Sequence, residues 1–213
     1  MVTGSGNVAA ETRPLAVWSA VTLSCPGTLE LAIGENQGIS IEAEANILPL
    51  IETVVNGARL TIRFTPGQPT IRPTKPIQFR AATPAIDAMA VSGSGAIRIP
   101  RIDGETLALE VSGSGNIHVE SAGASRVETR ISGSGAVTIG GDAVEQDIRI
   151  SGSGSLDARD LTSRRANVTI SGSGTAMLHV EDEINGRITG SGSVVYGGQP
   201  AASIRTTGSG RAV

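Results

Sequence analysis

The sequence predicts an all-β protein built as a β-solenoid, in which short parallel strands stack into a rod. Three observations support this: a repeat of about 18 to 20 residues, a two-residue alternation of apolar and polar side chains within it, and a composition with 28 Gly but only one Trp, one Tyr and two Phe. Each repeat has an aliphatic residue followed by a hydroxyl residue, Gly, Ser and Gly. The copies begin at Val91, Val111, Ile131, Ile150, Ile170, Ile188 and, more loosely, Thr206.

The alternation is clear in the repeat that spans residues 108–128. Val111, Ile117 and Val119 are apolar, whereas His118 is polar, which is typical of half-buried strands. If each repeat is one coil, successive coils pair as parallel strands about 4.8 Å apart, and equal positions stack into internal ladders. The position of Val111 would stack with Val91, Ile131, Ile150, Ile170, Ile188 and Thr206, and that of Ile117 with Ile97, Val137, Leu156, Ala176, Val194 and Ala212. A barrel or sandwich of hairpins is the weaker alternative, because the repeats lack Asn-Gly or Asp-Gly turns.

Two degenerate copies of the repeat are expected near the N-terminus. Val2–Gly6 reads Val-Thr-Gly-Ser-Gly, and Leu23–Gly27 reads Leu-Ser-Cys-Pro-Gly. We therefore expect residues 1–33 to form degenerate first rungs and residues 91–213 to form the regular rungs, within one β-solenoid domain that covers residues 1–213.

Residues 34–90 interrupt the repeat. Ile51–Val55 and Arg59–Phe64 flank an Asn-Gly pair, which is a strong hairpin signal. Four prolines in residues 65–76 predict an extended surface loop. We interpret the interruption as irregular strands, a hairpin and a Pro-rich loop that together form an irregular or widened end of the same solenoid.

The two glycines of each copy have a structural role in either of two ways. If the strand continues, Gly133 and Gly135 point inward and allow opposite walls to approach closely. If the chain turns a corner there, glycine supplies a positive φ. The sequence leaves both alternatives open.

Composition and charge exclude several classes of protein. A formal charge of −3, 17% charged residues and a pI near 5.4 give no basic stripe, which argues against a nucleic-acid partner. No apolar run is long enough to predict a transmembrane segment in this chain. Met1 is followed at once by the repeat, so no secretory leader is visible, although an extracytoplasmic protein given without its leader has the same appearance. Cys25 is a single cysteine without a disulfide or CxxC partner.

No catalytic set, metal site or cofactor is predicted. Calcium-binding β-rolls place a carboxylate two residues after the last glycine of each copy, and here those positions are Ile97, Ile117, Val137, Leu156 and Ala176. The repeated serines lack a His or Lys at a fixed spacing that could activate them. The Gly-Ser-Gly copies lack the Lys-Ser/Thr and helix of a phosphate-binding loop. His118 and His179 fall at different offsets within their repeats, so each is interpreted as a surface residue.

Charged residues on the outward side of the predicted sheet form a candidate ligand or partner site. The column before each aliphatic residue reads Ala90, Glu110, Arg130, Arg149, Thr169, Arg187 and Arg205. Two residues earlier, Glu128 and Asp147 would lie on adjacent rungs. The predicted stripe therefore consists of Glu128, Arg130, Asp147, Arg149, Arg187 and Arg205, and it suits an anion or a sugar. The alternative is the ordinary mixture of charges on a solvated sheet.

The repeated Val/Ile-Ser-Gly-Ser-Gly-x-Ile/Val, together with Gly4–Asn7, Leu23–Leu31 and Thr83–Ile86, resembles the bacterial family of unknown function called putative auto-transporter adhesin, head GIN domain. The resemblance covers essentially the whole chain. It implies a right-handed parallel β-helix in a secreted, periplasmic or surface-anchored bacterial protein, and it brings no catalytic residues. Cys25 stands where a Gly is expected, which puts the local turn geometry in doubt.

Two functions are consistent with these patterns. The first is a non-enzymatic extracytoplasmic adhesion or scaffold module, in the periplasm, outer membrane or cell surface, which presents polar ladders to a surface glycan or protein partner. The alternative is a carbohydrate-active β-helix that binds or cleaves polysaccharide through the Arg/Asp/Glu stripe. Because the last rung ends without a capping helix, we also expect either association of copies through the solenoid ends or a cap formed by the irregular N-terminal region.

Overall fold

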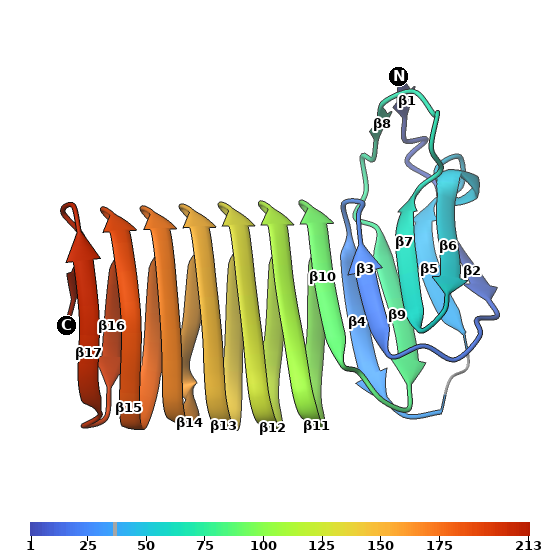
Figure 1. The fold of residues 1–213 in the computed structure, drawn as a ribbon. Helices are drawn as coiled ribbons and strands as arrows, with labels where there is room; N and C mark the ends of the chain where they lie inside the picture. Colours follow the sequence, from blue (N-terminus) through green and yellow to red (C-terminus); the bar gives the residue numbers. More distant parts are fainter. Residues whose placement is uncertain (36–37) are drawn as a thin grey trace.

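The computed structural model describes residues 1–35 and 38–213, and it shows a rod of stacked strands with an irregular end (Figure 1). The strands of the rod pair in parallel. In Figure 1 the rod advances from right to left. The chain rises on the side that faces the viewer, crosses the upper edge and descends on the far side, which makes the helix right-handed. The prediction of an all-β, right-handed parallel β-helix is confirmed. Among the described residues, the one helical segment is the 3₁₀ turn η1 at Leu48–Leu50.

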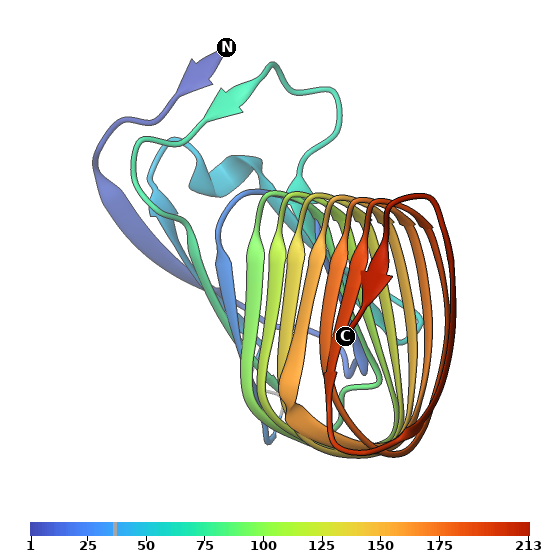
Figure 2. The same cartoon turned by 90° about the vertical axis from the view of Figure 1, so that its left-hand side faces the viewer.

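Each regular rung is one long strand bent around the rod. These strands are β11 (Ala96–Gly113), β12 (Asn116–Gly133), β13 (Ala136–Gly152), β14 (Ser155–Gly172) and β15 (Thr175–Gly190). Along the axis, two flat sides are joined by a tight edge and a rounded edge (Figure 2). The front side, which faces the viewer in Figure 1, contains the second halves of these strands with β10 (Ala88–Gly93) and β17 (Ala201–Thr207). The back side contains their first halves with β4 (Thr28–Ile33), β16 (Ser193–Gly197) and β18 (Arg211–Ala212).

The observed register confirms the predicted aliphatic columns. Val111 pairs with Val91 and Ile131, and Ile117 pairs with Ile97 and Val137. Their side chains are buried between the two flat sides. The core is therefore a stack of aliphatic ladders, in which each rung covers the apolar face of the next.

Differences in repeat length are absorbed at the rounded edge. The register shifts between Val119 and Ala122 where β12 meets the shorter β13, and again after Ala158 where β14 meets β15. The buried polar groups near this edge are satisfied, because Gln146 Nε2 donates to Ser163 Oγ at 2.8 Å and Ser163 Oγ donates onward to a backbone carbonyl. Insertions and deletions here leave the two flat sides in register.

At the tight edge, the positive φ considered for the glycines occurs at the first glycine of each copy, whereas the second glycine is required by close contact with the preceding rung. Gly133 has φ +119°, a conformation that L side chains rarely adopt. Gly135 has no such φ, but a Cβ there would lie 2.4 Å from Val111 Cγ1 and 2.4 Å from the Gly115 carbonyl oxygen. The first glycine therefore turns the corner, and the second lets the rungs approach closely.

Of the two degenerate copies, only the second forms a rung. β3 (Ala20–Leu23) pairs in parallel with β10, and β4 pairs with β11, so that Leu23 stacks on Val91. The expectation that Val2–Gly6 forms a rung is wrong. Val2–Thr3 is β1, which pairs with β8 (Ile71–Arg72) in a separate two-stranded sheet. The chain then continues into the strand at Val8–Arg13, which pairs antiparallel with the strand at Ile39–Glu44 and so does not follow the path of a rung.

The interruption, together with residues 8–13, builds the irregular end outside the first rung. Its strands are β2 (Val8–Arg13), β5 (Ile39–Glu44), β6 (Ile51–Asn56), β7 (Arg59–Phe64) and β9 (Gln78–Thr83). The front side continues in the order β10, β3, β7, β6, and the back side in the order β11, β4, β9, β5, β2. The predicted hairpin is confirmed, since β6 and β7 are antiparallel around Gly57 with φ +58°. The chain leaves the rod after β4 and returns to it at β10. Because β10 pairs with the edge of β3 that faces away from β7, the strand pairing of the front side continues without a break.

This irregular end covers the first rung, not the last (Figure 1). The last rung of the described chain consists of β17, paired with β15, and β18, paired with β16. The alternative in which the N-terminal region caps the last rung is therefore wrong, because its strands pair with β3 and β4 at the other end of the rod.

A buried carboxylate fastens the arm, by which we mean residues 1–7 and 65–76 around the β1–β8 pair. Glu44, only 1% exposed, accepts hydrogen bonds from the Thr74 hydroxyl at 2.6 Å, the Thr74 amide at 2.8 Å and the Gly6 amide at 2.6 Å. These bonds, chiefly that from the Thr74 hydroxyl, lower the pKa of Glu44 to about 2 although burial opposes the shift. Both halves of the arm are thus held by one ionised side chain.

Gly133→Ala should destabilise the rod by about 2 kcal/mol or more, because the residue must keep an unfavourable φ and its Cβ would lie 2.6 Å from the Gly113 carbonyl oxygen. Gly104→Ala is the matched control, since a Cβ there has no atom within 4 Å, and its effect should stay within about 1 kcal/mol. Denaturant unfolding of both variants checks this. Equal stabilities would contradict the role given to the tight edge.

Glu44→Gln should release the arm, because an amide cannot accept hydrogen bonds at both of its polar atoms. Hydrogen exchange at the amides of Gly6 and Thr74 should accelerate, whereas Glu42→Gln, on the exposed face of the same strand, should leave it unchanged.

The same clamp should respond to acid in the unchanged protein. A pKa lowered from 4.5 to about 2 means that the carboxylate contributes stability above pH 4.5 and loses it as the pH falls toward 2. Arm amides that stay fully protected at pH 2 would contradict this role for Glu44.

Candidate functional site

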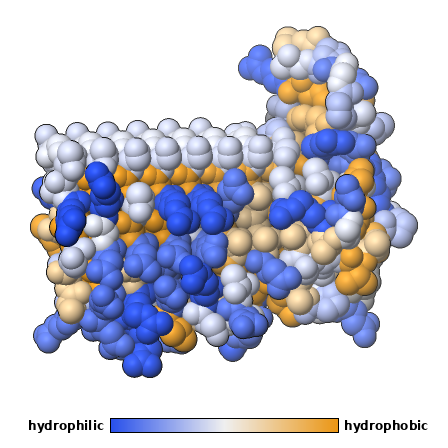
Figure 3. Space-filling view, viewed as in Figure 1, coloured by the Kyte–Doolittle hydropathy of each residue, from blue (hydrophilic) through white to orange (hydrophobic). Residues whose placement is uncertain are grey.

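The six residues of the predicted stripe lie on the outward face of the front side. One register column reads Arg130, Arg149, Thr169, Arg187 and Arg205. Glu128 and Asp147 are partners in the neighbouring column. Figure 3 shows this side, with strongly hydrophilic residues below the pale row of the tight edge. The structure therefore brings the stripe together as a continuous surface along the rod.

Arg126, which was not among the predicted residues, organises the acidic part of the stripe. Its guanidinium contacts Asp147, and it lies 3.3 Å from Glu128 Oε1 and 3.3 Å from Glu145 Oε2. The other oxygen of Glu128 lies 3.0 Å from Arg130 Nη2. Both predicted carboxylates are thus neutralised by arginines from the same sheet. Exposed ion pairs such as these contribute roughly 0–1 kcal/mol each, so their main effect is on the local charge.

The remaining arginines of the stripe have no acidic partner within the described part of the chain. The side chains of Arg149, Arg187 and Arg205 form neither a hydrogen bond nor an ion pair with any residue of 1–35 or 38–213. A guanidinium in this state can bind a carboxylate, sulfate or phosphate group in a bidentate manner. The front side is therefore divided into a self-neutralised cluster and a column of unpaired cations.

The residue types that catalysis would require are not arranged for it in this stripe. General acid–base cleavage of a glycosidic bond uses two carboxyl groups that face the substrate, but Glu128 and Asp147 face arginines.

Cys25 is buried, and burial raises the pKa of its thiol to about 12. His118 is the register partner of Thr138, and His179 that of Gly197, so the two histidines do not meet.

Two further observations concern residues 1–35 and 38–213. No group of three or more His, Cys, Asp or Glu side chains in this part of the chain is placed to hold a metal ion. It also contains no helix with the length and apolar character needed to cross a membrane.

A groove of about 900 Å³ lies on the back side where the rod meets the irregular end. β2, β5 and β9 flare away from the rod, as Figure 2 shows, and the concave surface continues over β4, β11 and β12. Glu30, Arg98 and His118 are register partners across this surface. Arg80, the partner of Glu30 on the other side, lies 3.3 Å from its carboxylate.

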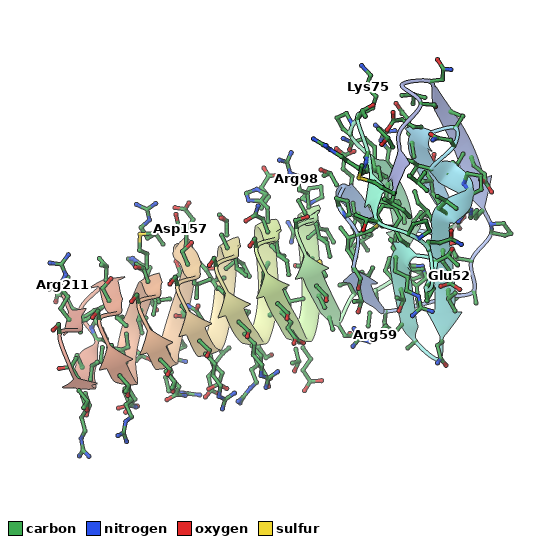
Figure 4. All side chains as sticks on the ribbon, turned by 90° about the horizontal axis from the view of Figure 1, so that it is seen from above. Glu52, Arg59, Lys75, Arg98, Asp157 and Arg211 are labelled. Atoms are coloured by element: carbon green, nitrogen blue, oxygen red, sulfur yellow. The ribbon has the colours of Figure 1, made fainter. Side chains whose placement is uncertain are left out.

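A smaller hollow of about 270 Å³ adjoins the groove and extends over β11 and β12 toward Asn116, at the start of β12. Arg98 and His118 line both cavities. In Figure 4, Arg98 projects from the back side close to the irregular end, on the same side as Asp157 and Arg211. These two side chains therefore occupy the junction of a continuous depression.

Sequence reasoning missed this groove because its wall comes from the interruption. Arg98 and His118 each lie seven residues after the aliphatic residue that begins their copy, so their common column was readable. The flare of β2, β5 and β9 was not, because it depends on pairings between strands that are far apart in the chain. The interpretation of His118 as an exposed residue is correct, although its neighbours place it at a cavity.

Several solved structures share this fold along nearly their whole length. A putative adhesin from Bacteroides fragilis superposes with a TM-score of 0.93 at 19% identity, covering 100% of this chain and 99% of that one. A putative lipid binding protein from Parabacteroides distasonis gives 0.82 at 20% identity, with 99% and 98% covered. A putative adhesin from Parabacteroides merdae gives 0.79 at 21% identity, with 99% and 97% covered.

At these identities the likeness is one of fold. No curated protein matches the sequence. The model of one family, described as putative auto-transporter adhesin, head GIN domain, matches residues 18–200 and so includes the first rung, the interruption at residues 34–90 and most of the regular rungs. The chain therefore belongs to this family.

Proposed function

We propose that the protein is a non-enzymatic adhesion or scaffold module that acts outside the cytoplasm of a bacterium, in the periplasm, at the outer membrane or at the cell surface. The observation that supports this best is the division of the front side. Arg126 neutralises the carboxylates, while Arg149, Arg187 and Arg205 stay unpaired. Such a surface attracts anions, and the two carboxylates of the predicted stripe are already paired with arginines.

The partner that suits this column is an acidic polymer, either a glycan or a protein surface. Successive rungs are about 4.8 Å apart. Arg187 and Arg205 lie on adjacent rungs, and the rung of Thr169 separates Arg187 from Arg149, so one polymer chain along the rod can contact all three. Each contact is weak because it is exposed, but linked contacts reinforce one another through a high effective concentration. The rigid rod contributes by holding the arginines in line before binding.

The alternative is a carbohydrate-active β-helix that binds and cleaves polysaccharide with Glu128, Arg130, Asp147 and Arg149. The clustering of these residues on adjacent rungs favours it. The ion pairs of both carboxylates disfavour it, since a substrate would first have to displace Arg126.

The groove on the back side favours a second function, the binding of an amphipathic ligand. Its volume of about 900 Å³ falls within the roughly 300–1,000 Å³ of small-molecule sites. Ala32, Ala82 and Pro100 supply apolar surface beside a few charged groups. One protein of the same fold is named a putative lipid binding protein, and the groove is the part of this chain that suits such a ligand.

The first function is tested by titrating the protein with a uronate polysaccharide such as alginate and assaying the mixture for unsaturated or reducing-end products. Binding should weaken with salt, and Arg149→Ala should lower affinity by about two- to fivefold, the range of one exposed ion pair. Arg101→Ala is the control, because Arg101 is already paired with Asp103. Product formation that Arg149→Ala abolishes would establish the alternative instead.

Association of copies through the solenoid ends is a further part of this proposal. The outer edge of β6 has no strand partner within the described residues, and an open edge can pair with another chain. Sedimentation should show a weight-average mass that rises with concentration. A single monomer mass across the whole range would count against association.

A further inference from the structure

Three residues on neighbouring strands of the back side give the groove a strip of apolar surface. Ala32 and Ala82 are register partners, and Pro100 lies on the next strand. All three lie at least partly exposed on the outer surface, whereas their neighbours Leu31, Ala81 and Ile99 are buried. No Phe, Tyr or Trp side chain is among the described residues that line the groove. This surface suits hydrocarbon better than sugar rings, which favour aromatic stacking partners.

One end of the groove is basic. Arg98 and His118 are exposed register partners that line both cavities. The carboxylate next to them, that of Glu30, is engaged by Arg80. The side chain of Arg98 has no hydrogen-bond or ion-pair partner in residues 1–35 or 38–213. Its guanidinium and the adjacent imidazole can donate to the oxygens of a phosphate or carboxylate group.

An acidic side chain lies beside this basic pair on β12. Glu120 follows His118 by two residues on β12, so both side chains lie on the same outward face about 7 Å apart along the strand. Glu120 is exposed and has no basic partner in the described chain. Glu35 lines the groove as well. A ligand with a single negative charge would leave these carboxylates without a partner, whereas a ligand that also carries an ammonium group would satisfy them.

We infer that the groove binds a zwitterionic phospholipid whose headgroup ends in a primary amine. Its phosphate is held by Arg98 and His118, its ammonium by Glu120, and the first part of its acyl chains lies against Ala32, Ala82 and Pro100. This inference rests on the second function proposed above, amphiphile binding, and adds the headgroup class and the residues that select it.

The test is calorimetric titration of the full chain with monomeric dihexanoyl phosphatidylethanolamine and, separately, with dihexanoyl phosphatidylglycerol, which lacks the amine. The unchanged protein should bind the amine lipid about fivefold more tightly. Arg98→Gln should weaken both lipids by a similar factor, because both carry the phosphate. Glu120→Gln should weaken only the amine lipid and remove the preference.

Two matched control variants each remove one charge, positive or negative, at a position outside the groove. Arg211→Gln alters an arginine on the same side at the far end of the rod (Figure 4), and Glu105→Gln alters an exposed glutamate on β11 that does not line the groove. Both should bind as the unchanged protein does. Equal binding of the two lipids, with Glu120→Gln silent, would overturn the inference but leave amphiphile binding intact. Binding of neither lipid would overturn both.

Discussion

Close stacking of the backbone at the tight edge is the constraint on which the rest of the structure depends. From Gly115 onward, each second glycine lies where a side chain would meet both the preceding rung's glycine carbonyl and an aliphatic side chain, as Gly135 does with Gly115 and Val111. The following backbone bonds repeat from rung to rung, for example from the Ser134 amide to the Gly113 carbonyl at 2.9 Å. Register is therefore set once per turn at this edge. Variation in length is left to the rounded edge, where the ladder shifts without disturbing either flat side.

Fixed register has opposite consequences inside and outside the rod. Inside, it aligns aliphatic residues into a core that needs few aromatic side chains, because each rung covers its neighbour. Outside, it aligns whatever residues stand at equal positions, so charges gather into columns. On the front side, Arg126 and Arg130 pair with neighbouring carboxylates, whereas the side chains of Arg149, Arg187 and Arg205 stay unpaired. On the back side, the flare of the irregular end turns a flat surface into a groove. Function in this family member is thus proposed for outward residues, with the core serving as their frame.

The sequence was sufficient for the parts of the fold that repeat. The columns of Val111 and Ile117, the rung at Leu23 and the Asn-Gly hairpin were all readable, because each depends on local spacing or on a period. Val2–Gly6 shows the limit of this reading. It has the repeat's residues, but β2 after it pairs with β5 and the carboxylate of Glu44 holds the segment in an arm. A pattern match cannot reveal pairings between distant segments.

The candidate site was predictable to a similar extent. The stripe follows from register alone, so its six members were found together. Arg126 was missed because the repeat shows which residues are aligned on successive rungs, but not which side chains contact a neighbouring column. The groove was missed because its wall is non-local.

The central claim is that binding uses outward residues repeated at the spacing of the rungs. Amide chemical-shift mapping of the full chain, titrated with a uronate oligosaccharide, tests it most directly. The account predicts shifts that recur on the several front-side rungs that carry Arg149, Arg187 and Arg205, with the back side unchanged. Shifts confined to a single rung, or absent from the front side, would contradict it.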